Sequence, residues 1–407
     1  MTRPRLELAE VIRSCGDAFL DQYGQSLSPE QRRALRDIAA CRTSALGGHR
    51  EECDRCGHRR IAYNSCRNRH CPKCQATAAA HWVEAQAADL LPVAYFHIVF
   101  TLPAALSPLA LQNPRVVYGL LFRAAAETLM QIAADAKHLG AEIGFLAVLH
   151  TWGQTLQHHP HVHCVVPGGG LSPDGTGWVA SPKGFFLPVR VLGRVFRGKF
   201  LAWLGAAFDR GRLAFHGRLR ELAGADRFHQ LLRAAAQTEW VVYAKPPFGG
   251  PEQVLKYLAR YTHRVAISNR RLVALKDGRV RFRYKDYARG GRRRTMTLEA
   301  SEFLRRFLQH VLPSGFVRIR HYGFLANRCR REKVALCREL LGVPATPAIE
   351  PPCGPAALIS GITPVRCALV CPACGEGRMV VIEVIPPTPV GRGLGERRGV
   401  APVFDTS

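Results

Sequence analysis

The chain has 407 residues, 47% of them hydrophobic, which is enough for two or three domains with sizeable cores and excludes wholesale disorder. Lys and Arg total 57 against 31 Asp and Glu, and the formal net charge of +26 favours nucleic acid over a membrane surface as the partner. The opening residues MTRPRLELAEVIRS are charged, unlike a secretory signal, and the apolar stretch 90–111 contains three prolines and a histidine, so we expect a cytoplasmic protein without a membrane span.

Apolar periodicity and turn residues predict a mixture of helices and strands. Ser28 and Pro29 mark a helix start, with the serine as the cap and the proline at the first helical position. Pro103 ends one apolar strand, and Pro167 with three glycines ends another. In chain order we expect two helices within 5–42, a helix at 75–91, a strand at 93–102, a helix at 115–137, strands at 143–151 and 161–166, a loop-rich part at 168–195, a helical part at 196–236, a strand at 239–244, a helix at 251–263, a hairpin at 270–284, a helix at 298–311, a strand at 316–321 and a basic helix at 327–341.

Four cysteines have the spacing of a zinc ribbon. Cys53 and Cys56 form one Cys-x-x-Cys pair, and Cys71 and Cys74 form a second pair after fourteen intervening residues. Clustered cysteines in an intracellular chain indicate metal ligands rather than disulfides, and four thiolates complete a tetrahedral structural Zn²⁺ site. Further candidate ligands, which leave a second zinc open, are Cys66, His49, His58 and His70.

The last 60 residues are rich in Pro and Gly, and we interpret them as a small appendage with a disordered tail. They carry another pair, Cys371 and Cys374, with Cys353 and Cys367 upstream. The irregular spacing leaves open whether these cysteines bind zinc.

The segment QHHPHVHCVV, residues 157–166, places two histidines on one face of a predicted strand. Alternate residues of a strand project to the same side, so His161 and His163 point together. Two imidazoles form half of a divalent-metal site. Gln154 is the preferred third ligand, because two imidazoles and an amide oxygen leave open positions that suit Mg²⁺ or Mn²⁺ acting on a phosphodiester. The rival third ligands are His150, His158, His159 and His97.

A tyrosine pair lies on the predicted helix PEQVLKYLARYTHR. Tyr257 and Tyr261 are four residues apart and share one helix face. Core packing is the alternative interpretation, since Val254 and Leu258 extend the same apolar stripe. A tyrosine hydroxyl can attack a phosphodiester and form a covalent phosphotyrosyl link, and a second tyrosine lets the enzyme hold one DNA end while it cuts another.

The predicted hairpin carries a strand with one cationic face. In GRVRFRYK, apolar Val280 and Phe282 alternate with basic residues that no acidic residue interrupts. This pattern favours contacts with phosphate, although a solvated face is the alternative. The candidate DNA-binding residues are Arg279, Arg281, Arg283 and Lys285 on this strand, Arg318 and Arg320 on the next, and Lys256, Arg260 and Arg264 on the tyrosine helix.

The sequence resembles the HUH endonucleases, named for a His-hydrophobic-His triplet, and more closely the two-tyrosine transposases of the insertion-sequence ninety-one family. The motifs that carry the resemblance occur in the family's order: YNSCRNRHCPKC, YFHIVFTLP, HTWGQTLQHHPHVHCVVPGGG, KYLARYTHRVAISNRR and RIRHYGFLANR. The resemblance implies a metal pair at His161 and His163, nucleophiles at Tyr257 and Tyr261, and rolling-circle-like transposition through single-stranded DNA. It also implies a third ligand at Gln154.

The resemblance implies an α+β fold with an HUH core, a ferredoxin-like antiparallel sheet with helices on one face. We expect partners to be single-stranded DNA at element ends and target DNA, in the cytoplasm near the bacterial nucleoid. A replication-initiator-type nicking enzyme and a non-catalytic zinc-containing DNA-binding regulator are the alternatives. We divide the chain into a helical segment 1–48, a zinc-ribbon-like module 49–91, a catalytic domain 92–270, a basic DNA-binding extension 271–345 and a tail 346–407.

Overall fold

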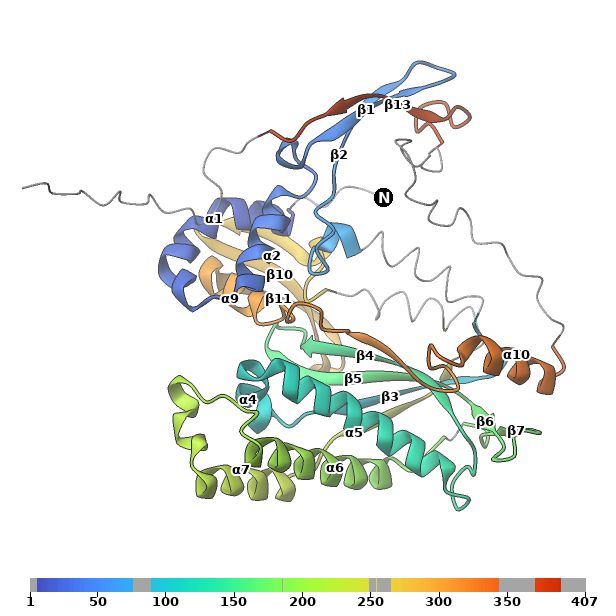
Figure 1. Ribbon diagram of the computed structural model, residues 1–407. Coiled ribbons are helices and arrows are strands. Elements are labelled where there is room, and N and C mark those ends of the chain that lie inside the picture. The colour runs from blue at the N-terminus through green and yellow to red at the C-terminus, as the bar shows by residue number, and fades with distance from the viewer. Residues whose placement is uncertain are drawn as a thin grey trace, which may run out of the picture.

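The computed structural model describes residues 6–75, 89–184, 186–248, 254, 265–343 and 370–388. Both tyrosines of the predicted nucleophile pair, Tyr257 and Tyr261, lie outside these residues, as do the cations predicted beside them, Lys256, Arg260 and Arg264. The predicted helices at 75–91 and 251–263 also fall mainly outside them. The fold is α+β, as predicted, with helices packed on an antiparallel sheet (Figure 1).

The centre of the molecule is a five-stranded antiparallel sheet in the order β12-β4-β5-β3-β8. Its strands are β3 (Tyr95–Thr101), β4 (Gly144–Trp152), β5 (His158–Pro167), β8 (Val242–Phe248) and β12 (Ile319–Gly323). Figure 1 shows one face of this sheet covered by α5 (Pro114–Ala134), α6 (Val189–Asp209) and α7 (Ala225–Gln237), and the short helix α4 (Ser107–Gln112) precedes α5.

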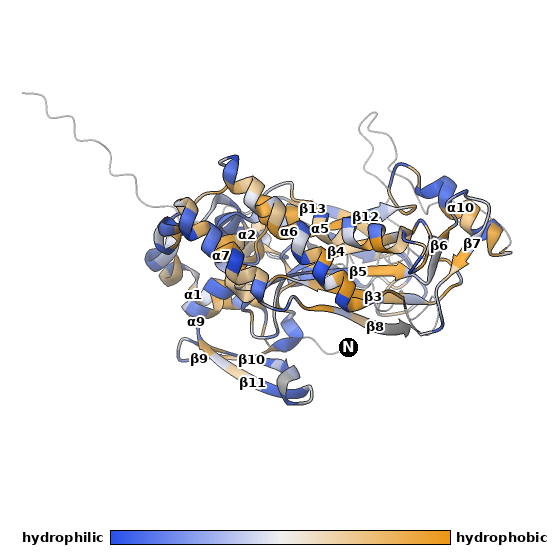
Figure 2. Ribbon diagram, turned by 90° about the horizontal axis from the view of Figure 1, so that it is seen from below, coloured by the Kyte–Doolittle hydropathy of each residue, from blue (hydrophilic) through white to orange (hydrophobic). Residues whose placement is uncertain are grey.

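The two faces of the sheet follow the alternation of its side chains. On β5, Val162, Cys164 and Val166 join the core beneath the helices, together with alternate residues of β3 and β4. The intervening residues, among them His161 and His163, therefore lie on the opposite face. Figure 2 shows hydrophobic β3–β5 behind helices whose surfaces alternate between hydrophilic and hydrophobic residues.

A second core joins parts of the chain that are far apart in sequence. It is built by α1 (Leu8–Tyr23), α2 (Pro29–Ala40), a sheet of β9 (Leu272–Lys276), β10 (Arg279–Asp286) and β11 (Arg292–Glu299), and α9 (Ala300–Leu308). Ser28 caps α2 as predicted, because its hydroxyl accepts a hydrogen bond from the Gln31 N–H at 3.2 Å. Trp152 and Leu156, at the turn between β4 and β5, also enter this core and connect it to the central sheet.

Three smaller elements complete the described residues. A three-stranded sheet of β1 (Gly48–Cys53), β2 (Arg59–Tyr63) and β13 (Met379–Ile385) forms a separate arm at the top of Figure 1. A hairpin of β6 (Gly169–Leu171) and β7 (Trp178–Ala180) and the helix α10 (Arg330–Leu340) lie at the other end of the central sheet.

Three predicted elements differ from the structure. The helical part expected at 196–236 is two helices, because the chain turns after Asp209 and forms a 3₁₀ helix, Gly217–Ala223, before α7. The hairpin expected at 270–284 gains a third strand, β11. The appendage expected within the last 60 residues contains a strand that was not predicted, β13, which pairs with β1.

One helix among the described residues, α5, is long and apolar enough to cross a membrane, but 61% of its most apolar window is buried within the protein. Its side chains pack against the central sheet, so α5 is a core helix here.

Candidate functional site

Three histidines meet on the face of the central sheet that lies opposite α5, α6 and α7. His161 and His163 lie on β5, and His150 lies directly opposite His161 on β4. One ring nitrogen from each residue lies within 4.8 Å of the other two. This spacing allows one divalent cation to contact all three, because metal–imidazole bonds are about 2.0–2.1 Å long. The predicted pair is therefore brought together, and His150 is the third member.

Hydrogen bonds fix which ring nitrogens of the pair face the site. The Nδ1 of His161 lies 2.6 Å from the carbonyl oxygen of His159, so Nδ1–H donates and Nε2 is left for a metal. The Nδ1 of His163 lies 2.7 Å from Nε2 of His97, on the neighbouring strand β3. Burial, together with the charges of Lys245 and His161, lowers the pKa of His97 to about 3, so this imidazole is neutral at pH 7. If Nε2 of His163 binds a metal, its Nδ1 carries the proton and donates to His97.

The other predicted ligands lie elsewhere. Gln154 follows the end of β4, and its side-chain oxygen accepts a hydrogen bond from the backbone N–H of Lys285 at 3.3 Å, so it contacts the hairpin instead. His158 points to the helix-covered side, where Nε2 lies 2.7 Å from the hydroxyl of Tyr118. Burial lowers the pKa of His158 to about 4.

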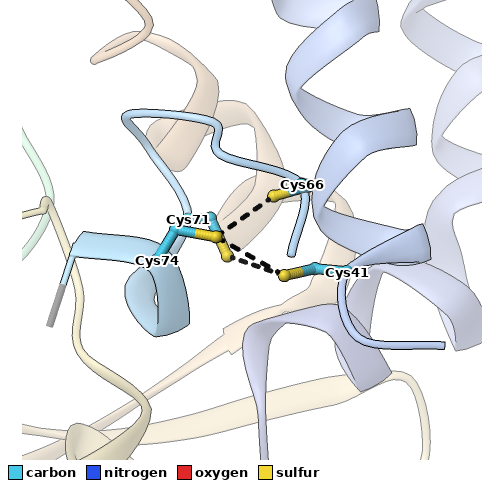
Figure 3. Close-up of side chains that lie close together, drawn as sticks. All are labelled: Cys41, Cys66, Cys71 and Cys74. Atoms are coloured by element: carbon cyan, nitrogen blue, oxygen red, sulfur yellow. Dashed lines mark hydrogen bonds between the residues drawn. The ribbon is translucent and has the colours of Figure 1, made fainter. Parts of the chain in front are cut away.

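The cysteines of the predicted ribbon do not form one group. Cys71 and Cys74, at the start of a helical turn, gather with Cys66 and with Cys41, which follows α2 (Figure 3). Neighbouring sulfurs in this group lie 3.6 Å apart, and three of the four cysteines are buried. The prediction that Cys53 and Cys56 share an ion with them is wrong, because those two cysteines lie in a different group.

Other predicted residues are placed differently as well. Cys66, a further candidate in the sequence, is a member of this group, whereas Cys41 was missed because it stands alone, without a Cys-x-x-Cys partner. His70 is buried and outside the group, and its Nε2 accepts the backbone N–H of Leu312 at 3.3 Å. Burial lowers its pKa to about 3.

The sequence matches two known families over most of its length. The family “Transposase zinc-binding domain” matches residues 11–102, and the family “Putative transposase” matches residues 144–333. The protein “Putative transposase y4qJ” of Sinorhizobium fredii is 58% identical over 386 residues, which are 94% of this chain and 96% of the relative. The “Transposase for insertion sequence element IS801” of Pseudomonas savastanoi pv. phaseolicola is 32% identical over 383 residues, which are 91% of this chain and 87% of the relative. The chain belongs to the IS91 family of transposases.

Among solved structures, the conjugative relaxase TrwC in complex with oriT DNA is 16% identical in sequence, with a TM-score of 0.22. The match covers 61% of this IS91-family transposase and 73% of the relaxase.

The zinc-binding domain of the transposase contains the complete group of Cys41, Cys66, Cys71 and Cys74. The matched domain and the cysteine groups together support structural zinc in this transposase.

The second cysteine group reaches beyond the matched zinc-binding domain. Cys53 and Cys56, in the turn between β1 and β2, gather with Cys371 and Cys374, which precede β13. The sequence held a signal for this pairing: CDRCG and CPACG share a glycine after the second cysteine, whereas CPKCQ, residues 71–75, has none.

The basic strand has the predicted two faces. On β10, Val280 and Phe282 are fully buried, whereas Arg279, Arg281 and Arg283 are exposed. The strand lies beside the end of the central sheet that carries His150 and His161, because the backbone N–H of Lys285 donates a hydrogen bond to the side chain of Gln154, in the turn between β4 and β5. Figure 2 shows β9–β11 projecting from the body of the transposase.

Two predicted DNA contacts lie on the opposite side from the histidines. Arg320 pairs with Ala147 on β4, and its guanidinium stacks 4.2 Å from the Phe122 ring on the helix-covered face. Arg318 is only 8% exposed, and burial lowers its pKa to about 10. The expectation that both project toward DNA as surface cations does not fit this placement.

Proposed function

We propose that this IS91-family transposase cuts and rejoins single-stranded DNA at the ends of its element through a covalent 5′-phosphotyrosine intermediate. The observation that carries the proposal is the convergence of His150, His161 and His163 on the sheet face opposite α5, α6 and α7. His150 and His163 are buried and His161 is half-buried, and the ring nitrogens of the three fit one divalent cation.

The nucleophile in this proposal is Tyr257 or Tyr261. Val254, three residues before the first of them, is fully buried and packs on the histidine face of the sheet against Leu146, Val148 and Val165. Val148 is the neighbour of His163 in the sheet register. The residue that stands three positions before Tyr257 therefore packs beside the histidines, which supports the proposal.

In the proposed cut, the tyrosine oxygen attacks the phosphorus, a new O–P bond forms, and the bond to the 3′ oxygen breaks. The phenol proton leaves, and the released strand ends in a 3′-hydroxyl. A 3′-hydroxyl that attacks the phosphotyrosine reverses the step and rejoins the strand without hydrolysis. His150, His161 and His163 would hold a divalent ion that orients the scissile phosphate, and the cationic face of β10 would bind the flanking backbone.

The ligand set bears on the identity of the ion. A bound Mg²⁺ or Mn²⁺ would offset the charge that develops on the scissile phosphate. Mg²⁺ prefers oxygen ligands, whereas affinity for imidazole rises along the transition series. With three nitrogen ligands, we expect Mn²⁺ to bind more tightly than Mg²⁺.

The test uses labelled single-stranded oligonucleotides that carry candidate element ends, incubated with the purified protein and Mn²⁺. We expect a covalent protein–DNA adduct on a denaturing gel, and no adduct with the double variant Tyr257→Phe, Tyr261→Phe. Tyr243→Phe is the matched control: this residue is 52% exposed and pairs with Val99 on β3, so it lies on the histidine face of the sheet. An adduct that survives in the double variant, or disappears in the control, contradicts the nucleophile assignment.

The same assay identifies the third ligand. His150→Ala should reduce the adduct by about 10²-fold or more, since a missing ligand weakens both the binding of the ion and the stabilisation of the transition state. Gln154→Ala should leave the adduct within about twofold, because its side chain contacts the hairpin. A large loss of adduct in Gln154→Ala together with little change in His150→Ala would instead identify Gln154 as the third ligand.

Two other outcomes separate the alternative functions. Tight binding of single-stranded DNA by the wild-type protein with no adduct under any metal would indicate a DNA-binding regulator. Adducts with plasmid origin sequences but not with element ends would indicate an initiator-type nicking enzyme.

A further inference from the structure

Four cysteines from the two ends of the chain gather at the tip of the β1–β2–β13 sheet. The Sγ atoms of Cys53 and Cys374 lie 3.8 Å apart, and those of Cys56 and Cys371 lie 3.7 Å apart. All four sulfurs lie within 4.8 Å of one another. In a tetrahedral site with Zn–S bonds of about 2.3 Å, neighbouring sulfurs are about 3.8 Å apart, so the spacing matches a bound Zn²⁺.

The two halves of this group have the same local conformation. In the first, the backbone N–H groups of Arg55 and Cys56 donate to the sulfur of Cys53 at 3.4 and 3.5 Å. In the second, Ala373 N–H donates to Cys371 Sγ at 3.4 Å. Such donors favour the thiolate form of a cysteine, which is the form that binds a metal.

A glycine follows the second cysteine in each half. Gly57 has φ of 70° and Gly375 has φ of 73°, in the left-handed region that other residues rarely adopt. Each glycine N–H donates to the carbonyl of the first cysteine, at 3.1 Å for Gly57 and 2.9 Å for Gly375. The chain therefore presents two equivalent cysteine turns to a common centre.

Contacts outside the sulfurs hold the two turns together. Asp54 N–H donates to the Arg378 carbonyl at 3.0 Å, and Arg378 N–H donates to the Asp54 carboxylate at 2.8 Å. Arg55 forms an ion pair with Glu376. A Cβ at Gly377 would lie 2.3 Å from the Cys53 sulfur, so only glycine allows this approach.

This small sheet buries very little apolar surface. Its cluster of buried residues consists of Cys53, Cys371 and Met379, and on β13 Val381 and Val384 are 48% and 76% exposed. A three-stranded sheet with so small a core needs an additional cross-link to remain folded. Four thiolates around one ion supply that cross-link.

We propose that Cys53, Cys56, Cys371 and Cys374 bind a second structural Zn²⁺, and that this ion fastens the C-terminal strand β13 to the N-terminal strands β1 and β2. The group of Cys41, Cys66, Cys71 and Cys74 has its own complete set of ligands, so the two sites are independent. On binding the ion, the cysteines that are still protonated release their protons to solvent.

The first test counts zinc ions by native mass spectrometry in the full chain, in a His161→Ala, His163→Ala background that removes the histidine site. We expect two zinc ions per chain, one after Cys371→Ser with Cys374→Ser, and one after Cys41→Ser with Cys66→Ser. Cys329→Ser, a half-buried cysteine outside both groups, is the control and should retain two. One ion in the parent protein, or two in the Cys371, Cys374 variant, would overturn the proposal.

The second test remains informative if a variant folds poorly, because it uses the unaltered protein. Cys56 is exposed, so as a free thiol it would react with iodoacetamide at once. As a zinc ligand it should stay unmodified until a strong chelator is added, and Cys371 and Cys374 should become reactive in step with it. Immediate alkylation of Cys56 in the zinc-loaded protein would refute the shared site.

Discussion

His97 is the residue that would orient the proposed metal site. It is buried on β3, and its Nε2 lies 2.7 Å from Nδ1 of His163, so it would accept the Nδ1 proton when Nε2 of His163 binds the ion. Its ring lies parallel to that of His163, with 5.0 Å between centroids. A partner of this kind fixes both the tautomer and the orientation of a metal-binding imidazole.

Removal of this partner should weaken the metal site without removing a ligand. We expect His97→Ala to lower Mn²⁺ affinity about 10- to 100-fold, as outer partners of metal-binding histidines commonly do. His97→Gln, whose amide oxygen can accept the same proton, should recover part of the loss. Titration calorimetry with Mn²⁺ measures the change, with His159→Ala as the control. An unchanged affinity in His97→Ala would show that His163 does not depend on this bond.

At the level of elements, the hairpin β9–β10 and its third strand β11 form a cationic ribbon beside the three histidines. The apolar side of β10 packs into the second core through Val280 and Phe282, and this packing holds the arginine side toward solvent. Arg271, just before β9, donates to the backbone carbonyls of Gln154 and of Arg283 on β10, so hydrogen bonds connect the ribbon to the turn between β4 and β5. DNA that lies along the ribbon would therefore run into the histidine face.

Neutralising this ribbon should weaken DNA binding in a salt-dependent way. We expect Arg281→Gln with Arg283→Gln to reduce affinity for single-stranded DNA and to lower the slope of log affinity against log salt by about 1.4, since each phosphate contact to a single strand contributes about 0.7. Fluorescence anisotropy between about 50 and 200 mM salt measures both changes. Arg210→Gln with Arg233→Gln, exposed residues at α6 and α7, should leave the slope unchanged.

The elements that sequence predicts well are those with a strong local pattern. The His-Val-His-Cys alternation of residues 161–164 on β5 indicated both the core-facing residues and the paired histidines, and both are present. β11 and β13 were missed for a physical reason. β11 offers only Met296 and Leu298 as apolar residues, and β13 is exposed on both faces, so each strand depends on a partner that a local pattern does not reveal.

The same reasoning applies to the sites. The pair His161 and His163 was predictable because two residues on one strand have a fixed geometry. The third ligand and the zinc partners depend on which distant segments pack together. His150, one of the rival third ligands, meets the pair through strand register, and Cys371 meets Cys56 across 315 residues, which local spacing does not reveal.

For the whole molecule, buried histidines set the response to acid. His70, His158 and His310 hold pKa values of about 3 to 4 because burial disfavours their charged form. His310 shows why: Nε2–H donates to the Leu156 carbonyl at 3.1 Å and Nδ1 accepts from the Thr151 hydroxyl at 3.1 Å, which only the neutral ring can do.

The folded state should therefore lose stability in mild acid. The unfolded chain takes up protons at these histidines near pH 6.5, while the folded chain stays neutral to about pH 3–4. The contribution of these neutral histidines to the free energy of unfolding is therefore complete above about pH 6.5, and it decreases as the pH falls toward 4. Urea midpoints at pH 7.0 and 5.0 measure the loss. His310→Gln should reduce the difference between the two urea midpoints, whereas His216→Gln, at an exposed histidine, should leave it unchanged. An equal difference in both variants would contradict the role given to the buried histidines.

The pairing of β13 with β1 has a consequence for synthesis. The turn at Cys53 leaves the ribosome early, but its partners at Cys371 and Cys374 follow 315 or more residues later, which is roughly 15 to 60 s at about 5–20 residues per second. During that interval the thiols of Cys53 and Cys56 lack the two partner cysteines that would complete the proposed zinc site, so they are exposed to oxidation and to binding of other metal ions. Any product truncated before residue 371 would lack β13 and both C-terminal cysteines, so its N-terminal arm would have neither its third strand nor its full set of thiolates.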